Sequence, residues 1–582
     1  MRHTPFAATA AFLCLMSGQV AAANPALDSL FANYQAYRIQ ANPIEAGNLG
    51  IEEARARLPD VSPAGQIAQE GALARLQQLA GAIPAQGLTP EEALDLRLLS
   101  VRLAEERASI RFDEARLPFL NDSGFHTVFE YLAQGNPIRN AKDSQAWLAR
   151  LSGFSTYYAR NIANARRGLK AGFVQPKLVA QRVLDVARLQ AARDPASDPL
   201  LDSLREAPLP PAEKAQALAE AERLLRGPIR EARISFVRFL EAEYLPKAKP
   251  TLAAKDWPGG AEYYRWLVRR HTTTELSPDA IHALGLSEVA RIRARMQDVM
   301  LTTGFSGSFA QFLAFLRTDP QFYAQSRESL LEHAAEISKR ADGQLPGLFG
   351  RLPRLSYGVR AVPLEIEEGY TTGRYQEGSP DLGVAGFYLV NTGNLPARPL
   401  YELPALTLHE AVPGHHLQIA LTQELAELPW HRRTADVTAF IEGWGLYSEY
   451  LGEEMGMYRT PYEMFGRLSY EMWRACRLVA DTGIHWKGWS LEQAGRCFRE
   501  NSALSEHNIK TELERYVAWP GQALGYKIGE IRLRELRAQA QAALGPKFDV
   551  RRFHDCVLLA GPLPLDVLSQ RVGTWIAAEQ KR

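Results

Sequence analysis

The segment with the clearest chemical potential is LTLHEAVPGHHLQ, residues 406–418. It contains His409 beside Glu410, and two further histidines, His415 and His416. Catalytic zinc sites commonly take two histidines and a glutamate as ligands and keep one position open for water. The metal lowers the pKa of that water, and a carboxylate that is not a ligand accepts the proton. These residue types therefore predict a zinc hydrolase site.

The spacing of the histidines excludes a regular helix as their support. His409 and His415 are six positions apart, and an unbroken α-helix would turn them about 240° away from each other. His416 would face the same way as His409 but about 10 Å further along the axis, too far to share one ion. Pro413 disrupts the preceding turn, and Gly414 tolerates unusual backbone angles. We expect a local bulge that returns His415 to His409, with His416 as the alternative second ligand.

The third ligand is expected on another helix. The segment TADVTAFIEGWGLYSEY, residues 434–450, has apolar residues at helical spacing. Its Glu442 shares a face with small residues, including Gly445, which let a second helix approach closely. A buried carboxylate needs a partner such as a metal ion. We predict Glu442 as the third ligand, with Glu449 as a weaker alternative, and Glu410 as the general base.

The same cluster of residues is also compatible with different functions. Three histidines within eight residues can be a solvated patch. A structural zinc would have four protein ligands and no open position. A fourth side chain from His416 or Glu449 would therefore favour a periplasmic peptide-binding or scaffold protein with a non-catalytic metal. A further alternative keeps the zinc hydrolase but replaces peptides with another amide or ester.

The elements that hold these groups are expected to be mostly helices. Before about residue 340, apolar residues recur at steps of three or four. Two examples are the sets Trp147, Leu151, Phe154, Tyr158, Ile162 and Leu286, Val289, Ile292, Met296, Val299. YGVRAVPLEI and GFYLVNTG, within residues 357–393, have the composition of strands. We predict a mainly α fold with a small antiparallel sheet near the site. GFYLVNTG is either an edge strand that pairs with a peptide or a buried scaffold strand.

The N-terminus predicts export. Residues 1–23 combine a basic start, a short apolar run and small residues at Ala21 and Ala23, as secretory signal peptides do. Cys14 follows Phe-Leu rather than small residues, so we do not expect a lipoprotein site. The mature chain, residues 24–582, is expected to be one catalytic domain, periplasmic or secreted, without an integral membrane segment.

Composition narrows the possible partners. The formal net charge is +1, which argues against nucleic acid as a partner. Apart from Cys14, the cysteines are Cys476, Cys497 and Cys556. This odd number without a CxxC motif argues against a cysteine zinc site and allows at most one disulfide.

Several motifs together resemble one family. HEAVPGHHLQ resembles the hallmark of the bacterial domain-of-unknown-function family 885. GGAEYYRWLVRRHTTTELSPDAIHALGLSEV, FIEGWGLYSE, RLVADTGIH and ERYVAWPGQALGYKIG are similar to the same family. That family looks like a branch of the glutamate-zincin metallopeptidases, near angiotensin-converting enzyme and the oligopeptidases. The resemblance implies a two-lobed helical scaffold with a deep cleft that binds peptides.

The resemblance also implies roles for downstream residues. In the angiotensin-converting type, a histidine and a tyrosine stabilise the oxyanion, and Tyr516 and His507 here are similar in order and spacing. A donor of this kind can lower the barrier by about 3 kcal/mol. The lysine two residues before that histidine is replaced by Ser505. Recognition of a peptide C-terminus is therefore not implied, and its candidates are Gln522, Tyr526, Lys527 and Lys510.

We therefore expect an exported zinc-dependent metallopeptidase that hydrolyses peptides, with Zn2+ held by His409, His415 and Glu442. Asp481 and His485 lie one helical turn apart. We expect them to form a polar pair in the core rather than to support a metal ligand.

Overall fold

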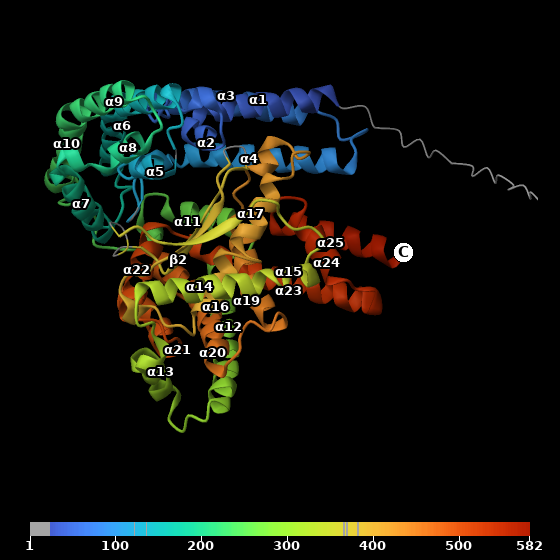
Figure 1. Cartoon of the computed structure of the whole chain (residues 1–582). Coiled ribbons are helices and arrows are strands. Elements are labelled where there is room, and N and C mark those ends of the chain that lie inside the picture. Colours follow the sequence, from blue (N-terminus) through green and yellow to red (C-terminus); the bar gives the residue numbers. More distant parts are fainter. Residues whose placement is uncertain (1–23, 122, 136, 365–366, 368–369, 381–382) are drawn as a thin grey trace, which may run out of the picture.

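A computed structural model of the chain describes residues 24–582 except 122, 136, 365–366, 368–369 and 381–382. The described residues are mainly helical, as predicted, with one small sheet (Figure 1). The predicted signal peptide lies outside the described residues. Within the described part of the chain, no helix has both the length and the apolar character needed to cross a bilayer.

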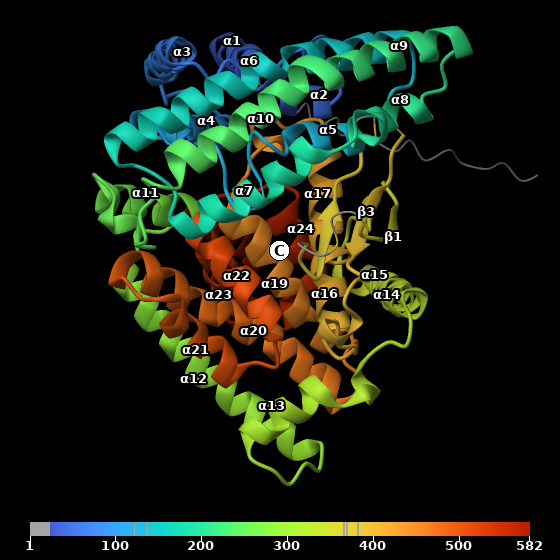
Figure 2. The same cartoon turned by 90° about the vertical axis from the view of Figure 1, so that its left-hand side faces the viewer.

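The N-terminal helices lie together on one side of the molecule, and Figures 1 and 2 agree on this arrangement. They are α1 (Pro25–Ala41), α2 (Pro43–Asn48), α3 (Pro63–Ala82), α4 (Pro90–Arg111), α5 (Val128–Gly135), α6 (Ala141–Ala171), α7 (Lys177–Ala192), α8 (Asp202–Glu206), α9 (Pro211–Leu224) and α10 (Arg230–Phe239).

The remaining elements form the larger body below them in both views. Its first half contains α11 (Gly260–Thr272), α12 (Pro278–Thr302), α13 (Phe309–Thr318), α14 (Arg327–Asp342), α15 (Leu345–Leu348), β1 (Tyr357–Ala361), β2 (Gly373–Gln376) and β3 (Gly386–Val390). Its second half contains α16 (Leu403–Glu410), α17 (His415–Gln423), α18 (Trp430–Arg433), α19 (Thr438–Glu454), α20 (Pro461–Thr482), α21 (Leu491–Asn501), α22 (Glu506–Ala518), α23 (Gly525–Leu544), α24 (Val550–Leu558) and α25 (Leu565–Gln580).

The described apolar side chains are buried in three cores. The largest unites the sheet with the helices from α11 to α25 except α18. A second core joins residues between Phe119 and Ala248 from helices α5–α10. A third, smaller core lies among α1, α3 and α4 and includes Tyr34 and Leu99. The two-lobed arrangement around a deep cleft stays a prediction.

Helical periodicity located the buried face of α6 correctly and that of α12 in part, since Ile292 and Met296 are buried there as predicted. All five apolar residues predicted to face the core from α6 are buried. In α12, however, Leu286 is 51% exposed. Gly285 faces α20 instead, where a methyl group on it would lie 2.8 Å from Cβ of Leu478. A glycine at a close helix contact carries no hydrophobic signal, so the apolar pattern assigned Leu286 to the buried face in its place.

The sheet is mixed rather than antiparallel throughout. β3 lies between β1 and β2, pairing in parallel with β1 and antiparallel with β2. The chain between β1 and β3 is long enough to contain β2 and return in the direction of β1. GFYLVNTG therefore contains the central strand, whose main chain pairs on both sides. The suggestion that it forms an edge strand for a peptide is wrong, and β2 is the edge strand nearer the predicted site.

Candidate metal centre

His409 and His415 meet because the chain breaks its helix between them. α16 ends at Glu410 and α17 begins at His415, with Ala411–Gly414 outside both helices. The six-residue spacing is thus accommodated by a break between two helices, rather than by the predicted bulge within one. The indole of Trp444 on α19 donates a hydrogen bond to the carbonyl oxygen of Pro413, at 2.8 Å, and so anchors the break.

Gly414 is required by a close approach of the main chain. A methyl group at this position would lie 1.9 Å from the carbonyl oxygen of His409 and 2.4 Å from that of Leu408. No larger residue fits here without moving the preceding turn. Glycine therefore supports the predicted irregularity by its lack of a side chain.

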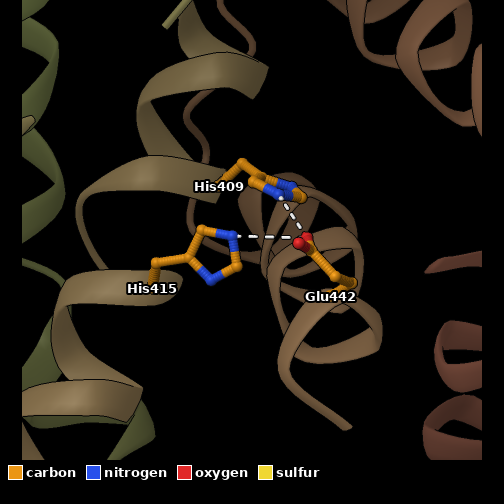
Figure 3. A group of neighbouring side chains, drawn as sticks. All are labelled: His409, His415 and Glu442. Carbon is orange, nitrogen blue, oxygen red and sulfur yellow. Dashed lines mark ion pairs between the residues drawn. The ribbon is translucent and has the colours of Figure 1, made fainter. Parts of the chain in front are cut away.

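The three predicted ligands converge on one point. Nε2 of His409 and Nε2 of His415 each lie 3.4 Å from the same oxygen, Oε2 of Glu442 (Figure 3). The two imidazole rings are perpendicular, with centroids 4.7 Å apart. Oε2 of Glu442 is buried and has no hydrogen-bond partner among the described residues. The structure thus brings together His409, His415 and Glu442 as the sequence predicted.

This separation fits a shared metal ion better than direct hydrogen bonds. Good nitrogen-to-oxygen hydrogen bonds span about 2.7 to 3.2 Å. Two ligand atoms about 2.1 Å from one zinc ion at the tetrahedral angle are roughly 3.4 Å apart. His409, His415 and Glu442 are also a group of described residues whose candidate ligand atoms all lie within 4.8 Å of one another. Two imidazoles and a carboxylate are a donor set that zinc takes.

The approach of α19 to His409 depends on glycines. A methyl group on Gly445 would lie 2.7 Å from Cε1 of the His409 ring. Two residues earlier, on another side of α19, Gly443 packs against Gly529 of α23, where an added methyl group would lie 2.6 Å from the Cα of Gly529. The prediction that small residues beside Glu442 allow close helix packing is confirmed, and this packing brings the carboxylate within reach of both histidines.

The protonation states of His409 and Glu442 depend on each other. Burial opposes ionisation of His409, but its contacts with Glu442 and Glu449 raise its pKa to about 9. Burial also opposes ionisation of Glu442, yet the two neighbouring histidines hold its pKa well below the usual value. Each group therefore stabilises the charged form of its neighbours, as expected of oppositely charged side chains that lie close together.

Neither predicted alternative ligand closes the coordination shell. His416 is buried on the side of the sheet, where its Nδ1 lies 3.0 Å from the hydroxyl of Tyr375 and its ring packs 4.6 Å from that of Tyr357. Burial lowers its pKa to about 4. Glu449 contacts the far nitrogen of His409, Nδ1, at 2.8 Å. The candidate metal-ligand group among the described residues, His409, His415 and Glu442, thus has three members, the number of protein ligands that catalytic zinc sites have.

Glu410 is buried beside His409 and faces the edge of the sheet. Its Oε2 accepts a 2.7 Å hydrogen bond from the main-chain N–H of Tyr375 in β2. This N–H is directed away from β3, since Tyr375 pairs with Tyr388 only on its other side. The outer edge of β2 therefore faces Glu410. No sequence signal pointed to β2, because GRYQ is short and has no β-branched residue.

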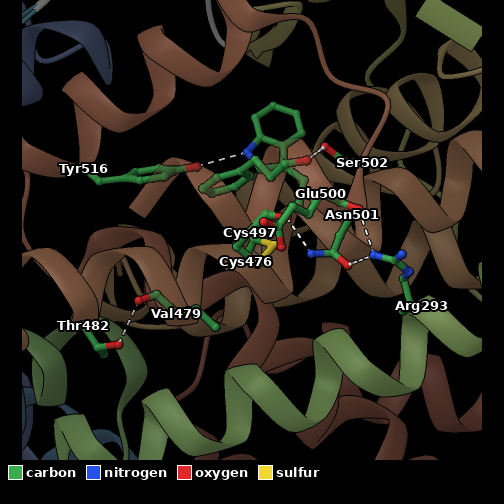
Figure 4. The surroundings of a disulfide bond; sticks show 11 residues. Arg293, Cys476, Val479, Thr482, Cys497, Glu500, Asn501, Ser502 and Tyr516 are labelled. Atoms are coloured by element: carbon green, nitrogen blue, oxygen red, sulfur yellow. Dashed lines mark hydrogen bonds between the residues drawn. A yellow bond between two sulfur atoms is a disulfide. The ribbon is translucent and has the colours of Figure 1, made fainter. Parts of the chain in front are cut away.

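Tyr516 is buried in a polar network. Its hydroxyl contacts the indole of Trp473 at 3.0 Å, the guanidinium of Arg477 at 2.9 Å and the carboxylate of Glu512 at 2.8 Å. Figure 4 shows it near the Cys476–Cys497 disulfide, which leaves Cys556 free. None of the contacts found for Tyr516 reaches the three ligands, and its role as oxyanion donor stays a prediction.

His507 lies exposed on α22, and its role likewise stays a prediction. Lys527, a candidate for binding a peptide C-terminus, is fully buried and forms ion pairs with Glu288, Glu471 and Glu530. It is therefore already neutralised by the protein. Gln522 accepts a hydrogen bond from Arg515.

Tyr526 is the tyrosine that contacts the centre. Its ring is nearly parallel to that of His409, with 6.3 Å between centroids. On α23 it is half-buried, and the guanidinium of Arg477 lies 4.2 Å from its ring centroid. Burial and the charge of Glu442 raise the pKa of its hydroxyl, so it stays protonated. The sequence pointed to Tyr526 only for substrate binding, because the resemblance directed attention to the Arg-Tyr pair ten residues earlier.

Comparison with known proteins identifies relatives across nearly the whole chain. The family described as "Bacterial protein of unknown function (DUF885)" matches residues 43–572. A solved structure described as a putative lipoprotein from Colwellia psychrerythraea is 28% identical, with a TM-score of 0.90 over 95% of this chain and 99% of that one. No curated protein matches.

A second solved structure shares the fold alone. It is described as a putative lipoprotein of unknown function from Shewanella oneidensis, with 17% identity and a TM-score of 0.68. The match covers 94% of this chain and 96% of that chain.

Proposed function

The chain belongs to the bacterial DUF885 family, and from its own side chains we propose that it is a zinc-dependent hydrolase that cleaves peptide bonds. The observation that carries this proposal is the convergence of Nε2 of His409, Nε2 of His415 and Oε2 of Glu442, with both separations at 3.4 Å. A zinc ion held there would polarise a carbonyl group and make water acidic enough to be deprotonated near neutral pH.

Glu410 is the proposed general base. Its carboxylate is next to a ligand in sequence and is held by the N–H of Tyr375 rather than by a cation. One oxygen is therefore fixed, and the other can accept a proton from water and pass it to the leaving amine. The nearby edge of β2 supports a peptide as substrate, because an extended chain can pair with an edge strand through main-chain hydrogen bonds.

Tyr526 is the proposed donor to the oxyanion, supported by Tyr516 through Arg477. The Arg477 guanidinium contacts the Tyr526 ring and also donates to the Tyr516 hydroxyl. No hydrogen bond to the Tyr526 hydroxyl is found among the described residues, so this group is free to donate to a substrate. Tyr516, in contrast, already contacts three side chains.

Export is part of the proposal. The two solved relatives are described as putative lipoproteins, and such proteins are exported. The N-terminal segment has the composition of a secretory signal peptide. The family and the relatives carry no activity in their descriptions, so the catalytic part of the proposal depends on the site itself.

Metal analysis joined to peptide digestion tests this function. We expect about one equivalent of zinc in the purified protein and its loss in His415→Ala, with zinc retained in His507→Ala, which changes an exposed histidine. A peptide library should be cleaved by the wild-type protein, and a chelator should prevent cleavage. Glu410→Gln should retain zinc and lose hydrolysis. A wild-type protein without bound metal, or an undiminished Glu410→Gln variant, would contradict the proposal.

The two tyrosines can be separated by kinetics. Removing one oxyanion donor costs about 10²- to 10³-fold in kcat. Tyr526→Phe should lose activity on this scale with unchanged zinc content and KM. Tyr516→Phe should cost less, since its hydroxyl acts only through Arg477. The opposite order of losses would assign the donor role to Tyr516, as the resemblance implies.

A further inference from the structure

His415 and His416 are consecutive in the sequence, but their side chains point to different sides of α17. Nε2 of His415 faces Glu442 in the candidate metal centre. Nδ1 of His416 lies 3.0 Å from the hydroxyl of Tyr375 in β2. α17 begins at His415, so both histidines belong to the first turn after the break. One dipeptide thus joins the candidate metal centre to the sheet.

The hydrogen bond between Tyr375 and His416 has a defined direction. The ring of His416 also hydrogen-bonds to the main chain of Leu355. The N–H of Leu355 donates to Glu424, so the carbonyl oxygen of Leu355 is the group that accepts from the ring. A neutral imidazole that donates from one nitrogen accepts at the other, so the hydroxyl of Tyr375 donates to Nδ1 of His416.

Close packing restricts the hydroxyl of Tyr375 and the ring of His416. A methyl group on Gly386, in the neighbouring strand β3, would overlap the Tyr375 hydroxyl. On the other side of the sheet's order, the ring of Tyr357 in β1 packs 4.6 Å from the ring of His416. His416 therefore contacts both edge strands of the sheet, and the Tyr375 hydroxyl has little room to move.

The main chain of the same tyrosine holds the proposed general base. Oε2 of Glu410 accepts a 2.7 Å hydrogen bond from the N–H of Tyr375. Glu410 is the last residue of α16 and His416 lies in the first turn of α17, so Tyr375 links the two helices across the break. β2 is four residues long and pairs with a strand on one side, in β3. A side-chain contact can therefore decide where this strand lies.

We propose that His416 and Tyr375 are positioning residues that set the carboxylate of Glu410 relative to His409 and His415. The proposal rests on the proposed function and goes beyond it, because it assigns a role to the histidine that the metal-ligand group does not use. A general base must lie within hydrogen-bond reach of the proton that it accepts, about 2.6 to 3.2 Å. A small displacement of β2 would therefore slow the reaction.

Tyr375→Phe tests this link with the smallest change, because it removes the hydroxyl and keeps both the ring and the main-chain N–H. A general base contributes about 10²- to 10⁴-fold to the rate, and a misplaced base should lose part of this, so kcat should fall about 10- to 100-fold. Zinc content and KM should stay unchanged. A role in substrate binding alone would instead raise KM. An unchanged kcat, or a raised KM without a fall in kcat, would overturn the proposal.

Variants of His416 separate its hydrogen bond from its bulk. His416→Asn keeps an acceptor oxygen near the position of Nδ1, whereas His416→Leu removes the acceptor. His416→Asn should therefore retain more activity than His416→Leu. Tyr375→Phe added to His416→Leu should cost no further activity, because both changes remove the same contact. Losses that multiply in the double variant would overturn the proposed link, and Tyr375→Phe alone still tests it if His416→Leu does not fold.

A matched control and a readout without turnover complete the test. The hydroxyl of Tyr158 donates to the carbonyl oxygen of His126 at 3.1 Å in the separate core of α5–α10, so Tyr158→Phe should lose stability and keep kcat. Amide hydrogens of residues 373–376 should exchange faster in Tyr375→Phe than in the wild-type protein, as measured by mass spectrometry of proteolytic fragments. Equal exchange would overturn the link between His416 and β2. Absent zinc or absent hydrolysis by the wild-type protein would count against the proposed function alone, while the exchange comparison still decides the link.

Discussion

Oε1 of Glu449 lies 2.8 Å from Nδ1 of His409, on the opposite side of the ring from Glu442. The same oxygen is 3.2 Å from the guanidinium of Arg474, which fixes the carboxylate in turn. When a metal ion takes the Nε2 lone pair, this contact would hold the remaining ring proton on Nδ1 and so orient the imidazole. The sequence suggested Glu449 as a weaker alternative metal ligand. In the structure it contacts Nδ1 of His409, so its proposed role is to orient that ring.

Glu449→Gln should weaken metal binding without abolishing it. An amide can still contact Nδ1 but loses the charge that makes the imidazole a stronger ligand. Changes of this kind cost about 10- to 100-fold in metal affinity. Competition with a chelator of known affinity measures the loss. Glu454→Gln, on the same helix but paired with Arg537 at the surface, is the control. Equal zinc affinity in the Glu449→Gln and wild-type proteins would remove Glu449 from the site.

Gly445→Ala should disturb the metal centre more than the fold. The added methyl group would lie 2.7 Å from the His409 ring, so the ring or α19 must move. Overpacking of this kind typically costs about 1 to 3 kcal/mol. We expect weaker zinc binding together with a lower free energy of unfolding. Gly573→Ala in α25, with nothing within 4 Å of the added methyl group, should be neutral or slightly stabilising. A Gly445→Ala protein with normal zinc affinity would show that the close approach is not needed.

The three candidate metal ligands were accessible from the sequence because the constraint on them is local and chemical. His409 and His415 cannot meet on a regular helix, and Pro413 with Gly414 marks the break that allows it. Small residues beside Glu442 signalled close helix packing, which Gly445 confirms. Such signals depend on residue type and spacing, and they do not require knowledge of distant parts of the chain.

The surroundings of the ligands were less accessible, because they depend on tertiary packing. β2 is too short to have a periodic pattern, yet it supplies the N–H that holds Glu410. Tyr526 could be placed against His409 only once the packing of α23 on α19 was known. The parallel pairing of β1 with β3 likewise depends on the path of the chain between them, because the composition of a strand does not indicate its direction in the sheet.

The Cys476–Cys497 disulfide should contribute to stability. It links α20 to α21 across 21 residues, and closing a loop of about this length stabilises by roughly 3 kcal/mol through the unfolded state. A double variant, Cys476→Ala with Cys497→Ala, should unfold at lower urea concentration. A reducing agent should lower the midpoint of the wild-type protein and leave that of the double variant unchanged. Equal midpoints for the oxidised wild-type protein and the double variant would contradict this contribution.

Asp481 should make stability depend on pH. It is fully buried in α20 and accepts hydrogen bonds from the hydroxyl of Tyr264 at 2.6 Å and the N–H of Gly521 at 3.0 Å. It does not hydrogen-bond to His485, whose two ring nitrogens contact the main chain of Ala254 and Tyr516. The predicted core location is confirmed, but the two side chains do not pair. Burial raises the pKa of Asp481 to about 7 despite these hydrogen bonds.

The direction of the effect follows from the raised pKa. Between about pH 4 and pH 7 the unfolded chain binds fewer protons at this carboxyl than the folded chain, so the free energy of unfolding falls as pH rises. Asp481→Asn removes this contribution, because an amide does not titrate. Urea unfolding at pH 5 and pH 7.5 should show the wild-type protein losing roughly 2 kcal/mol more than the variant across this interval. Asp298→Asn, which changes an exposed residue of α12, should follow the wild-type protein at both pH values. Parallel behaviour of Asp481→Asn and the wild-type protein would show that Asp481 is ionised in the folded state well below pH 7.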